Sequence, residues 1–445
     1  PPPPPPPPTT LYLSSAASDV YKRQCPVRSD CLDYAVEARE RFGVWGGMTE
    51  KQRRRQLRKS AEGVRGVRCG GVCRSIRSQF PPATHGSAAL NPTVGAVTTM
   101  LAPMTDFSWP AVLNRVMAGE HLSRDQAHAA MDEIMSGRAT QAQVAAFFVA
   151  IRAKGETAEE MTGLVEGMLD AEVTVDIGEP VVDTAGTGGD ASGTFNISTT
   201  AALIAAGAGA KIAKHGNRAA SSKTGSADLL EALGVRLDLP PEVTVLRVRE
   251  VGFGFFFSPA YHPAMRHAGS VRRELGVRTV FNFLGPLANP ARATRQALGV
   301  SDHRMAERMI QVLANLGAEV AFVYHGEDGL DELTTTGPSF IYRLKAGEIT
   351  HAEFTPEDFG VARATLDDLK GGDAAENVAI TRAILAGVPG PKRDIAVVNA
   401  APAIVAAGMA EGFVEGVDLA QQAIDAGDAQ GVLERVVAMS EEFAE

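Results

Sequence analysis

The sequence contains no long uncharged apolar run. Nowhere in the chain do about 18 consecutive apolar residues occur, which is roughly the shortest stretch that spans a membrane as a helix. An excess of positive charge is also lacking, because 43 Lys and Arg stand against 53 Asp and Glu, for a formal net charge of −10. With 45% hydrophobic and 22% charged residues, the composition favours a soluble globular protein that binds neither a membrane nor, as a whole chain, nucleic acid.

Cysteine is scarce and unevenly placed. The four cysteines, Cys25, Cys31, Cys69 and Cys73, all lie before Pro103. Up to Pro103 the chain carries 15 basic and 7 acidic residues, whereas the remaining 342 residues carry 28 and 46. So large a change of sign indicates a boundary between pieces of different origin. The cysteine-free remainder fits a reducing compartment, so we expect a cytoplasmic protein.

Residues 1–103 are predicted to be a leader, either non-native or disordered. Eight prolines open the chain as a polyproline II stub without core-forming capacity, and no apolar signal-peptide region follows them. The string Ser14–Gln24 resembles a translated sequencing adapter, with a natural disordered tail as the alternative. Met104 would make a natural start.

Within this leader, residues 25–59 resemble the second half of a WhiB-type iron–sulfur regulator. The resemblance rests on the Cys25–Cys31 pair, the turn Gly43–Gly47 and the basic stretch Lys51–Lys59. That family implies four cysteine ligands for an iron–sulfur cluster and a basic tail that contacts DNA phosphates. Two of the cysteines are missing here and the two later ones have the wrong spacing, so we expect no working cluster.

A small α-helical domain is predicted over residues 104–172. Three capping boxes follow one another at Ser123–Gln126, Thr140–Gln143 and Thr157–Glu160, and each opens a segment with apolar residues at helical spacing. Glycines at or just past the segment ends can supply left-handed C-caps. We therefore expect about four short helices whose apolar faces form a core.

After Val173 the pattern changes to short apolar runs that alternate with helical segments. The candidate strands are Val181–Asp183, Ile212–Lys214, Phe253–Phe257, Ala297–Val300 and Val320–Tyr324. This alternation predicts an α/β domain over residues 173–445, with a mostly parallel sheet covered by helices. Ligands of such folds bind at the carboxyl ends of the strands, and the unusual residues of this chain fall at those ends.

A glycine-rich loop leaves the first of these strands. It reads Gly186-Thr-Gly-Gly-Asp190, and the segment Thr194–Thr200 then opens a helix. Glycines let backbone N–H groups approach an anion, and a helix N-terminus adds a favourable dipole. The spacing matches neither a Walker loop nor a dinucleotide fingerprint. A tight structural turn is the alternative.

A second polar loop follows the next strand. The run Lys214–Ser222, with Gly225 and Ser226 close behind, combines a cation, an amide and several hydroxyl groups. These groups suit a polyanionic ligand that carries hydroxyls, and a solvated polar loop is the alternative. Because both loops follow strands, they favour one shared ligand.

Two further features carry charge. Asp331 and Glu332 are adjacent carboxylates after a buried strand, which suit Mg²⁺ shared with phosphate oxygens unless they form only a solvated turn. Arg272 is a candidate ligand for an anion, with a surface salt bridge as the alternative. No nucleophile or acid–base pair stands out, so we predict no catalytic residue of those kinds.

Together and in this order, these motifs resemble the anthranilate phosphoribosyltransferase family over residues 104–445. The two loops, the stretch Val271–Pro290 and the run Asp328–Glu332 carry the resemblance. It implies a homodimer with the class III nucleoside-phosphorylase type of fold, in which helices near residues 270–290 complete the α domain. It also implies transfer of the phosphoribosyl group of 5-phosphoribosyl 1-diphosphate to anthranilate in tryptophan biosynthesis, with release of pyrophosphate.

The resemblance also assigns ligands. The diphosphate donor would be held by Gly186, Gly189, Asp190, Thr194, Asn196, Ile197, Ser198, Thr199, Lys214, His215, Gly216, Asn217, Arg218, Ala219, Ala220, Ser221, Ser222 and Ser226. Mg²⁺, the expected cofactor, would be bound by Ser198, Asp331 and Glu332, and anthranilate would be contacted by Gly186, Asn217 and Arg272. Loss of pyrophosphate from a sugar with oxocarbenium character needs positioning and charge stabilisation, which explains why no nucleophile is visible.

Two other functions remain open at this point. A nucleoside phosphorylase of the same fold would bind inorganic phosphate and a nucleoside, but the paired carboxylates favour a metal-bridged diphosphate and Arg272 favours an acidic acceptor. A redox-sensing DNA-binding protein would need the two cluster ligands that the leader lacks.

Overall fold

The computed structural model describes residues 107–219 and 223–443, and all of them belong to one unit, Met100–Glu445. The predicted leader with its WhiB-like stretch, and the loop residues Ala220, Ser221 and Ser222, lie outside the described residues.

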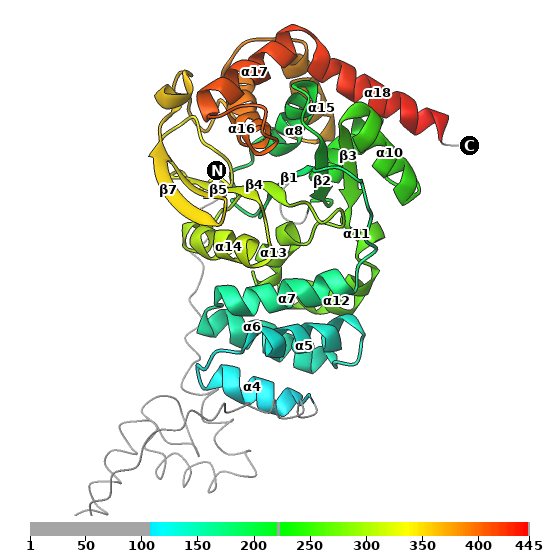
Figure 1. Ribbon diagram of the computed structural model, residues 1–445, viewed down its shortest axis with the longest axis vertical. Coiled ribbons are helices and arrows are strands. Elements are labelled where there is room, and N and C mark those ends of the chain that lie inside the picture. The colour runs from blue at the N-terminus through cyan, green and yellow to red at the C-terminus, as the bar shows by residue number, and fades with distance from the viewer. Residues whose placement is uncertain (1–106, 220–222, 444–445) are drawn as a thin grey trace, which may run out of the picture. The chain divides into compact units, whose positions relative to one another are not determined.

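Four stacked helices begin the described chain and form one end of the unit (Figure 1). They are α4 (Trp109–Met117), α5 (Arg124–Met135), α6 (Gln141–Lys154) and α7 (Ala158–Asp170). The three predicted capping boxes are confirmed, because Ser123, Thr140 and Thr157 each accept a hydrogen bond from the backbone three residues later. Two later helices, α12 (Arg266–Leu275) and α13 (Phe281–Leu284), contribute buried side chains to the same hydrophobic cluster.

A seven-stranded sheet forms the centre of the remainder. Its strands are β1 (Val182–Gly186), β2 (Ile212–Gly216), β3 (Phe253–Phe257), β4 (Arg295–Gly299), β5 (Val320–Gly326), β6 (Ser339–Lys345) and β7 (Glu348–Phe354). Their order is β3-β2-β1-β4-β5-β6-β7, in which the first five are parallel and the last two antiparallel. The predicted mostly parallel sheet is confirmed, and the antiparallel hairpin is an addition to it.

Helices cover both faces of this sheet (Figure 1). They are α8 (Ile197–Gly207), α9 (Ser226–Ala232), α10 (Pro241–Val251), α11 (Ser258–Tyr261), α14 (His303–Asn315), α15 (Ala374–Leu385), α16 (Pro391–Ala406), α17 (Phe413–Asp425) and α18 (Asp428–Glu442). The described residues also contain the short 3₁₀ helices η2 (Pro263–Met265), η3 (Gly285–Leu287) and η4 (Pro356–Phe359).

Alternation along the strands separates two cores. On β5, Phe322 and Tyr324 join the cluster formed with α8, α16 and α17, whereas Ala321 and Val323 join the cluster shared with α14 and the stacked helices. This is the period-two pattern of a strand buried on both faces. The sheet is therefore fixed from both sides, and its carboxyl edge is a rigid base for the loops that follow.

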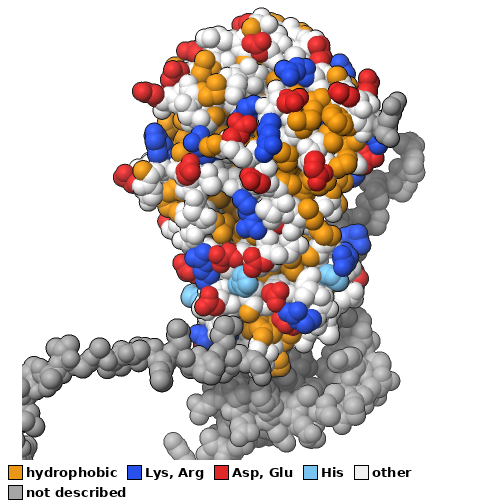
Figure 2. Space-filling model, turned by 45° about the vertical axis from the view of Figure 1, so that its right-hand side comes forward, with side chains coloured by type: hydrophobic (Ala, Val, Ile, Leu, Met, Phe, Trp, Pro, Cys, Tyr) orange, Lys and Arg blue, Asp and Glu red, His pale blue; other side chains and the backbone are white. Residues whose placement is uncertain are grey.

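No helix of the described residues is long and apolar enough to cross a membrane. On the face shown in Figure 2, basic and acidic side chains are intermingled over the described surface. Exposed ion pairs of the described residues include Arg363 with Glu357 and Arg236 with Asp238.

Candidate active site

The acidic loop after β5 lies directly against the ends of two other strands. Gly186 at the end of β1 is in register with Gly299 at the end of β4. A methyl group at Gly299 would lie 1.6 Å from the Asp331 carbonyl oxygen, and one at Gly186 would lie 2.5 Å from Asp331 Oδ2. Neither position therefore has room for a side chain, and the two glycines allow the carboxylates to approach the glycine-rich loop.

Hydrogen bonds fix the shape of that glycine-rich loop. The Gly188 N–H donates to Asp331 Oδ2 at 2.7 Å. Arg278 donates to the carbonyl oxygens of Gly188 (2.9 Å) and Gly189 (3.2 Å), and Ser301 also donates to that of Gly188 (2.9 Å). Arg278 was not among the predicted site residues. The only sequence signal for it is its place inside the motif Val271–Pro290.

Asp331 and Glu332 form a buried pair of carboxylates. Burial, followed by the charge of Asp190, raises the pKa of Asp331 to about 6. Burial and the neighbouring Asp331 raise the pKa of Glu332 well above its usual range, and Glu332 Oε2 has no hydrogen-bond partner among the described residues. Two desolvated carboxylates, one of them with an unsatisfied oxygen, are stabilised by added positive charge, so these residues fit a divalent metal ion.

Lys214 and the start of α8 complete the cluster. The Lys214 ammonium, from the middle of β2, is buried, donates to the Thr184 carbonyl oxygen and lies 3.5 Å from Ser198 Oγ. Burial lowers the pKa of Lys214 against the attraction of Asp183, Glu332 and Asp331. Because Ser198 stands in the first turn of α8, the positive end of the helix dipole lies beside these charges, an arrangement suited to anions.

Helix α16 holds the acidic loop in place. The Leu333 N–H donates to Asn399 Oδ1 at 2.8 Å, and Asn399 Nδ2 donates back to the Leu333 carbonyl oxygen at 2.9 Å. Asn399 is buried within α16, so the residue after Glu332 is tied to the centre of the larger core. Sequence reasoning did not identify this contact.

The remaining predicted residues are divided between the cluster and its surroundings. Asn196 donates to the Thr224 carbonyl oxygen and accepts from Asn377, which links the two polar loops. The Ser226 hydroxyl donates to the Asn217 carbonyl oxygen. Asp190 accepts from the Ser192 hydroxyl, and Thr194 pairs with Lys370 in an isolated bridge.

Two predicted side chains are engaged elsewhere. The His215 ring lies 2.7 Å from Ser258 Oγ, and burial lowers its pKa to about 3, so it is neutral. The exposed Arg218 guanidinium forms ion pairs with Glu231 and Asp228. Their backbone N–H groups are engaged as well, His215 with Asp183 Oδ1 at 3.1 Å and Arg218 with Asn217 Oδ1 at 2.7 Å.

Arg272 lies in the last turn of α12. Its guanidinium packs 5.5 Å from the centre of the Phe281 ring, and burial lowers its pKa. Within the described residues it forms no ion pair, so the surface salt bridge considered above does not occur there, whereas the next residue, Arg273, is exposed. A half-buried guanidinium without an acidic partner is a ready ligand for a carboxylate.

Two family models match this architecture. Residues 110–171 match "Glycosyl transferase family, helical bundle domain", and residues 178–430 match "Glycosyl transferase family, a/b domain". Fold and site thus define a glycosyl transferase. A further model, "Transcription factor WhiB", matches residues 13–56.

Individual relatives narrow the class. The anthranilate phosphoribosyltransferase of Moorella thermoacetica is 51% identical over 335 residues, which cover 75% of this chain and 99% of the relative. The Thermus thermophilus enzyme matches with a TM-score of 0.71 and 43% identity, over 74% of this chain and 99% of its own. A Saccharomyces cerevisiae enzyme in complex with PRPP and Mg matches with a TM-score of 0.70 and 27% identity, over 76% and 99%. The chain belongs to the anthranilate phosphoribosyltransferase family.

Proposed function

We propose that this enzyme transfers the phosphoribosyl group of 5-phosphoribosyl 1-diphosphate to the amine of anthranilate and releases pyrophosphate, as a step of tryptophan biosynthesis. The observation that carries the proposal is the buried carboxylate pair Asp331–Glu332, which lies against the glycine-rich loop with one Glu332 oxygen unsatisfied. A diphosphate carries more negative charge than inorganic phosphate and therefore needs a metal ion to balance it, and the carboxylate pair can hold that ion. A phosphorylase acting on inorganic phosphate has less need of such a pair.

The donor is proposed to occupy the carboxyl ends of β1 and β2. Its phosphates would meet backbone N–H groups of the glycine-rich loop and of the first turn of α8, with Lys214 as a point charge. The further residues proposed to line the same ligand are Gly186, Gly189, Asp190, Thr194, Asn196–Thr199, His215–Ser222 and Ser226. The support is geometric: hydrogen bonds already join the two loops through Asn196.

Mg²⁺ is proposed to bind at Ser198, Asp331 and Glu332. When bound, it would neutralise negative charge on the departing diphosphate. Two carboxylates and a hydroxyl leave coordination positions for phosphate oxygens and water, which is how Mg²⁺ is usually held beside phosphates. The unsatisfied Glu332 oxygen supports this assignment.

The acceptor is proposed to bind through its carboxylate to Arg272, with Asn217 and Gly186 beside it. A guanidinium holds a carboxylate in a fixed orientation and so directs the neighbouring amine toward the sugar. The chain itself needs to supply no nucleophile, because the amine attacks a carbon that the leaving diphosphate has made electron-poor.

We further propose that the enzyme acts as a homodimer in the cytoplasm, with a helical domain at residues 104–172 completed by helices near 270–290, and an α/β domain at 173–445. The decisive experiment follows pyrophosphate release and phosphoribosylanthranilate formation in parallel. Both should require anthranilate, the diphosphate donor and Mg²⁺ together. Phosphorolysis of nucleosides without anthranilate-dependent turnover would contradict the proposal.

A further inference from the structure

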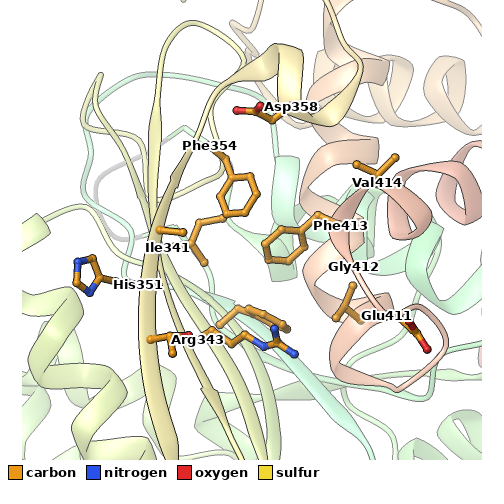
Figure 3. Close-up of a pocket in the computed structure, with 13 residues that line it drawn as sticks. Ile341, Arg343, His351, Phe354, Asp358, Glu411, Gly412, Phe413 and Val414 are labelled. Carbon is orange, nitrogen blue, oxygen red and sulfur yellow. The ribbon is translucent and has the colours of Figure 1, made fainter.

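A pocket apart from the candidate active site lies between the β6–β7 hairpin and the start of α17 (Figure 3). Its volume is about 290 Å³, and none of its lining residues is a predicted site residue. Apolar side chains form most of its wall: Phe322, Ile341, Phe354, Val405 and Phe413. The volume is at the lower end of the ~300–1,000 Å³ typical of ligand pockets, so an occupant must be small.

The aromatic part of the wall is already assembled. The Phe413 ring meets the Phe322 ring edge to face, with centroids 5.1 Å apart, and meets Phe354 in the same way at 5.3 Å. Phe354 also stacks on Phe359 at 5.6 Å. These mutual contacts fix the rings, so a flat apolar ligand would find a prepared surface with little ordering cost.

One cation faces this surface. The Arg343 guanidinium lies 6.0 Å from the centre of the Phe322 ring, and Figure 3 shows its side chain extending into the pocket below Phe413. Arg343 Nε is buried without a hydrogen-bond partner, and no ion pair joins Arg343 to an acidic residue in the part of the chain that the structure describes. A guanidinium in this setting is complementary to a planar anion.

The acidic residues of the pocket limit the charge of that anion. Asp358 already accepts hydrogen bonds from the backbone and hydroxyl of Thr355, and Glu411 stands on the opposite side, before α17. In Figure 3 both carboxylates point away from Arg343. Negative charge at both ends disfavours a phosphate or diphosphate and favours a single carboxylate between them.

We propose that this pocket binds a small aromatic monocarboxylate, with its ring against Phe354 and Phe413 and its carboxylate on Arg343. The proposal is independent of the proposed function, because the pocket shares no residue with the candidate active site.

The test is calorimetric titration of the full chain with 3-phenylpropionate and with its neutral amide, 3-phenylpropanamide. The acid should bind, and the amide should bind at least about tenfold more weakly, because it cannot pair with a guanidinium. Arg343→Gln should weaken binding of the acid by about tenfold or more. Arg363→Gln, which removes an exposed arginine paired with Glu357, is the matched control and should change nothing.

Two more variants locate the bound acid. Thr350→Trp places a large ring in the pocket from an exposed position of β7 and should abolish binding even if Arg343→Gln folds poorly. Arg272→Ala, in the candidate active site, should leave binding intact. The proposal is overturned if no binding appears at millimolar acid, if acid and amide bind equally, or if Arg272→Ala rather than Arg343→Gln removes binding. A change of sedimentation mass in Thr350→Trp would equally overturn it, since the face would then join two copies of the chain.

Discussion

Without a bound cation, the pair Asp331–Glu332 should destabilise the folded protein at neutral pH by a measurable amount. Burial raises the pKa of Asp331 from 3.8 to about 6. Each pKa unit corresponds to about 1.36 kcal/mol, so an ionised Asp331 costs the folded state about 3 kcal/mol relative to the unfolded chain. The raised pKa of Glu332 adds a cost of the same sign.

The raised pKa determines how the stability of the folded protein changes with pH. The folded state holds the Asp331 proton more tightly than the unfolded chain does. The stability that this proton contributes is fully present below pH 3.8 and is lost as the pH rises through about 6. Metal-free protein should therefore be less stable at pH 8 than the same protein with the two charges removed. Mg²⁺ that binds only the folded state should recover the loss.

The assay is urea unfolding of the natural chain and of Asp331→Asn with Glu332→Gln, at pH 5 and pH 8, with and without Mg²⁺. At pH 8 without metal, the double variant should be about 3 kcal/mol more stable, and the gain should be smaller at pH 5. Saturating Mg²⁺ should stabilise only the natural chain, and only the natural chain should show Mg²⁺-dependent turnover. A double variant no more stable than the natural chain at pH 8 would show that the two charges are already compensated, and the reasoning would be refuted.

Three further predictions concern other parts of the chain. Arg272→Ala should raise the KM for anthranilate about tenfold to a hundredfold, as expected for loss of a charge-assisted pair worth ~1.5–3 kcal/mol. It should change the KM for the donor little, and the control Arg273→Ala should change neither KM. Equal weakening of donor and acceptor in steady-state kinetics would place Arg272 in the phosphate site or the fold. Arg278→Ala should raise the KM for the donor about tenfold, because the Gly188 and Gly189 carbonyl groups lose the hydrogen bonds that Arg278 donates. The control Arg304→Ala, at an exposed position, should leave this KM unchanged. Unchanged kinetics in Arg278→Ala would mean that the glycine-rich loop keeps its shape without Arg278. A chain from Met104 to Glu445 should match the full chain in activity and thermal midpoint, and a loss beyond about tenfold, roughly 1.4 kcal/mol, would show that the leader contributes.

Much of the fold could be predicted because its signals are local. The capping boxes and the five apolar runs each lie within a few residues, and the parallel strands β1 to β5 followed from them. The hairpin of β6 and β7 could not be predicted in this way. Its outer strand is exposed along almost its whole length, and its turn uses Ala346 and Gly347 with positive φ in place of an Asn-Gly or Asp-Gly pair.

Site prediction was limited by side-chain direction and by long-range contacts. Lys214 and His215 are neighbours on β2, so a strand sends their side chains to opposite faces, and only Lys214 reaches the carboxylates. Both residues were assigned to the donor from the sequence, although the two-residue period of a strand would have separated them. Arg278 and Asn399, in contrast, meet their partners across 90 and 66 residues, and no local pattern reveals such a pairing.

The amide pair between Asn399 and Leu333 holds the acidic loop, which contains Asp331 and Glu332, against α16. A loop held only by its neighbours opens locally, and its N–H groups exchange with solvent long before the protein unfolds. Here the Leu333 N–H is bound by a helix whose residues from Ile395 to Ala406 are all buried. Since two hydrogen bonds tie Leu333 to this buried helix, we expect its amide to exchange with deuterium only when α16 itself leaves the core. On heating, catalytic activity should consequently persist until the whole unit melts, without an earlier phase in which the acidic loop opens while the rest of the enzyme stays folded.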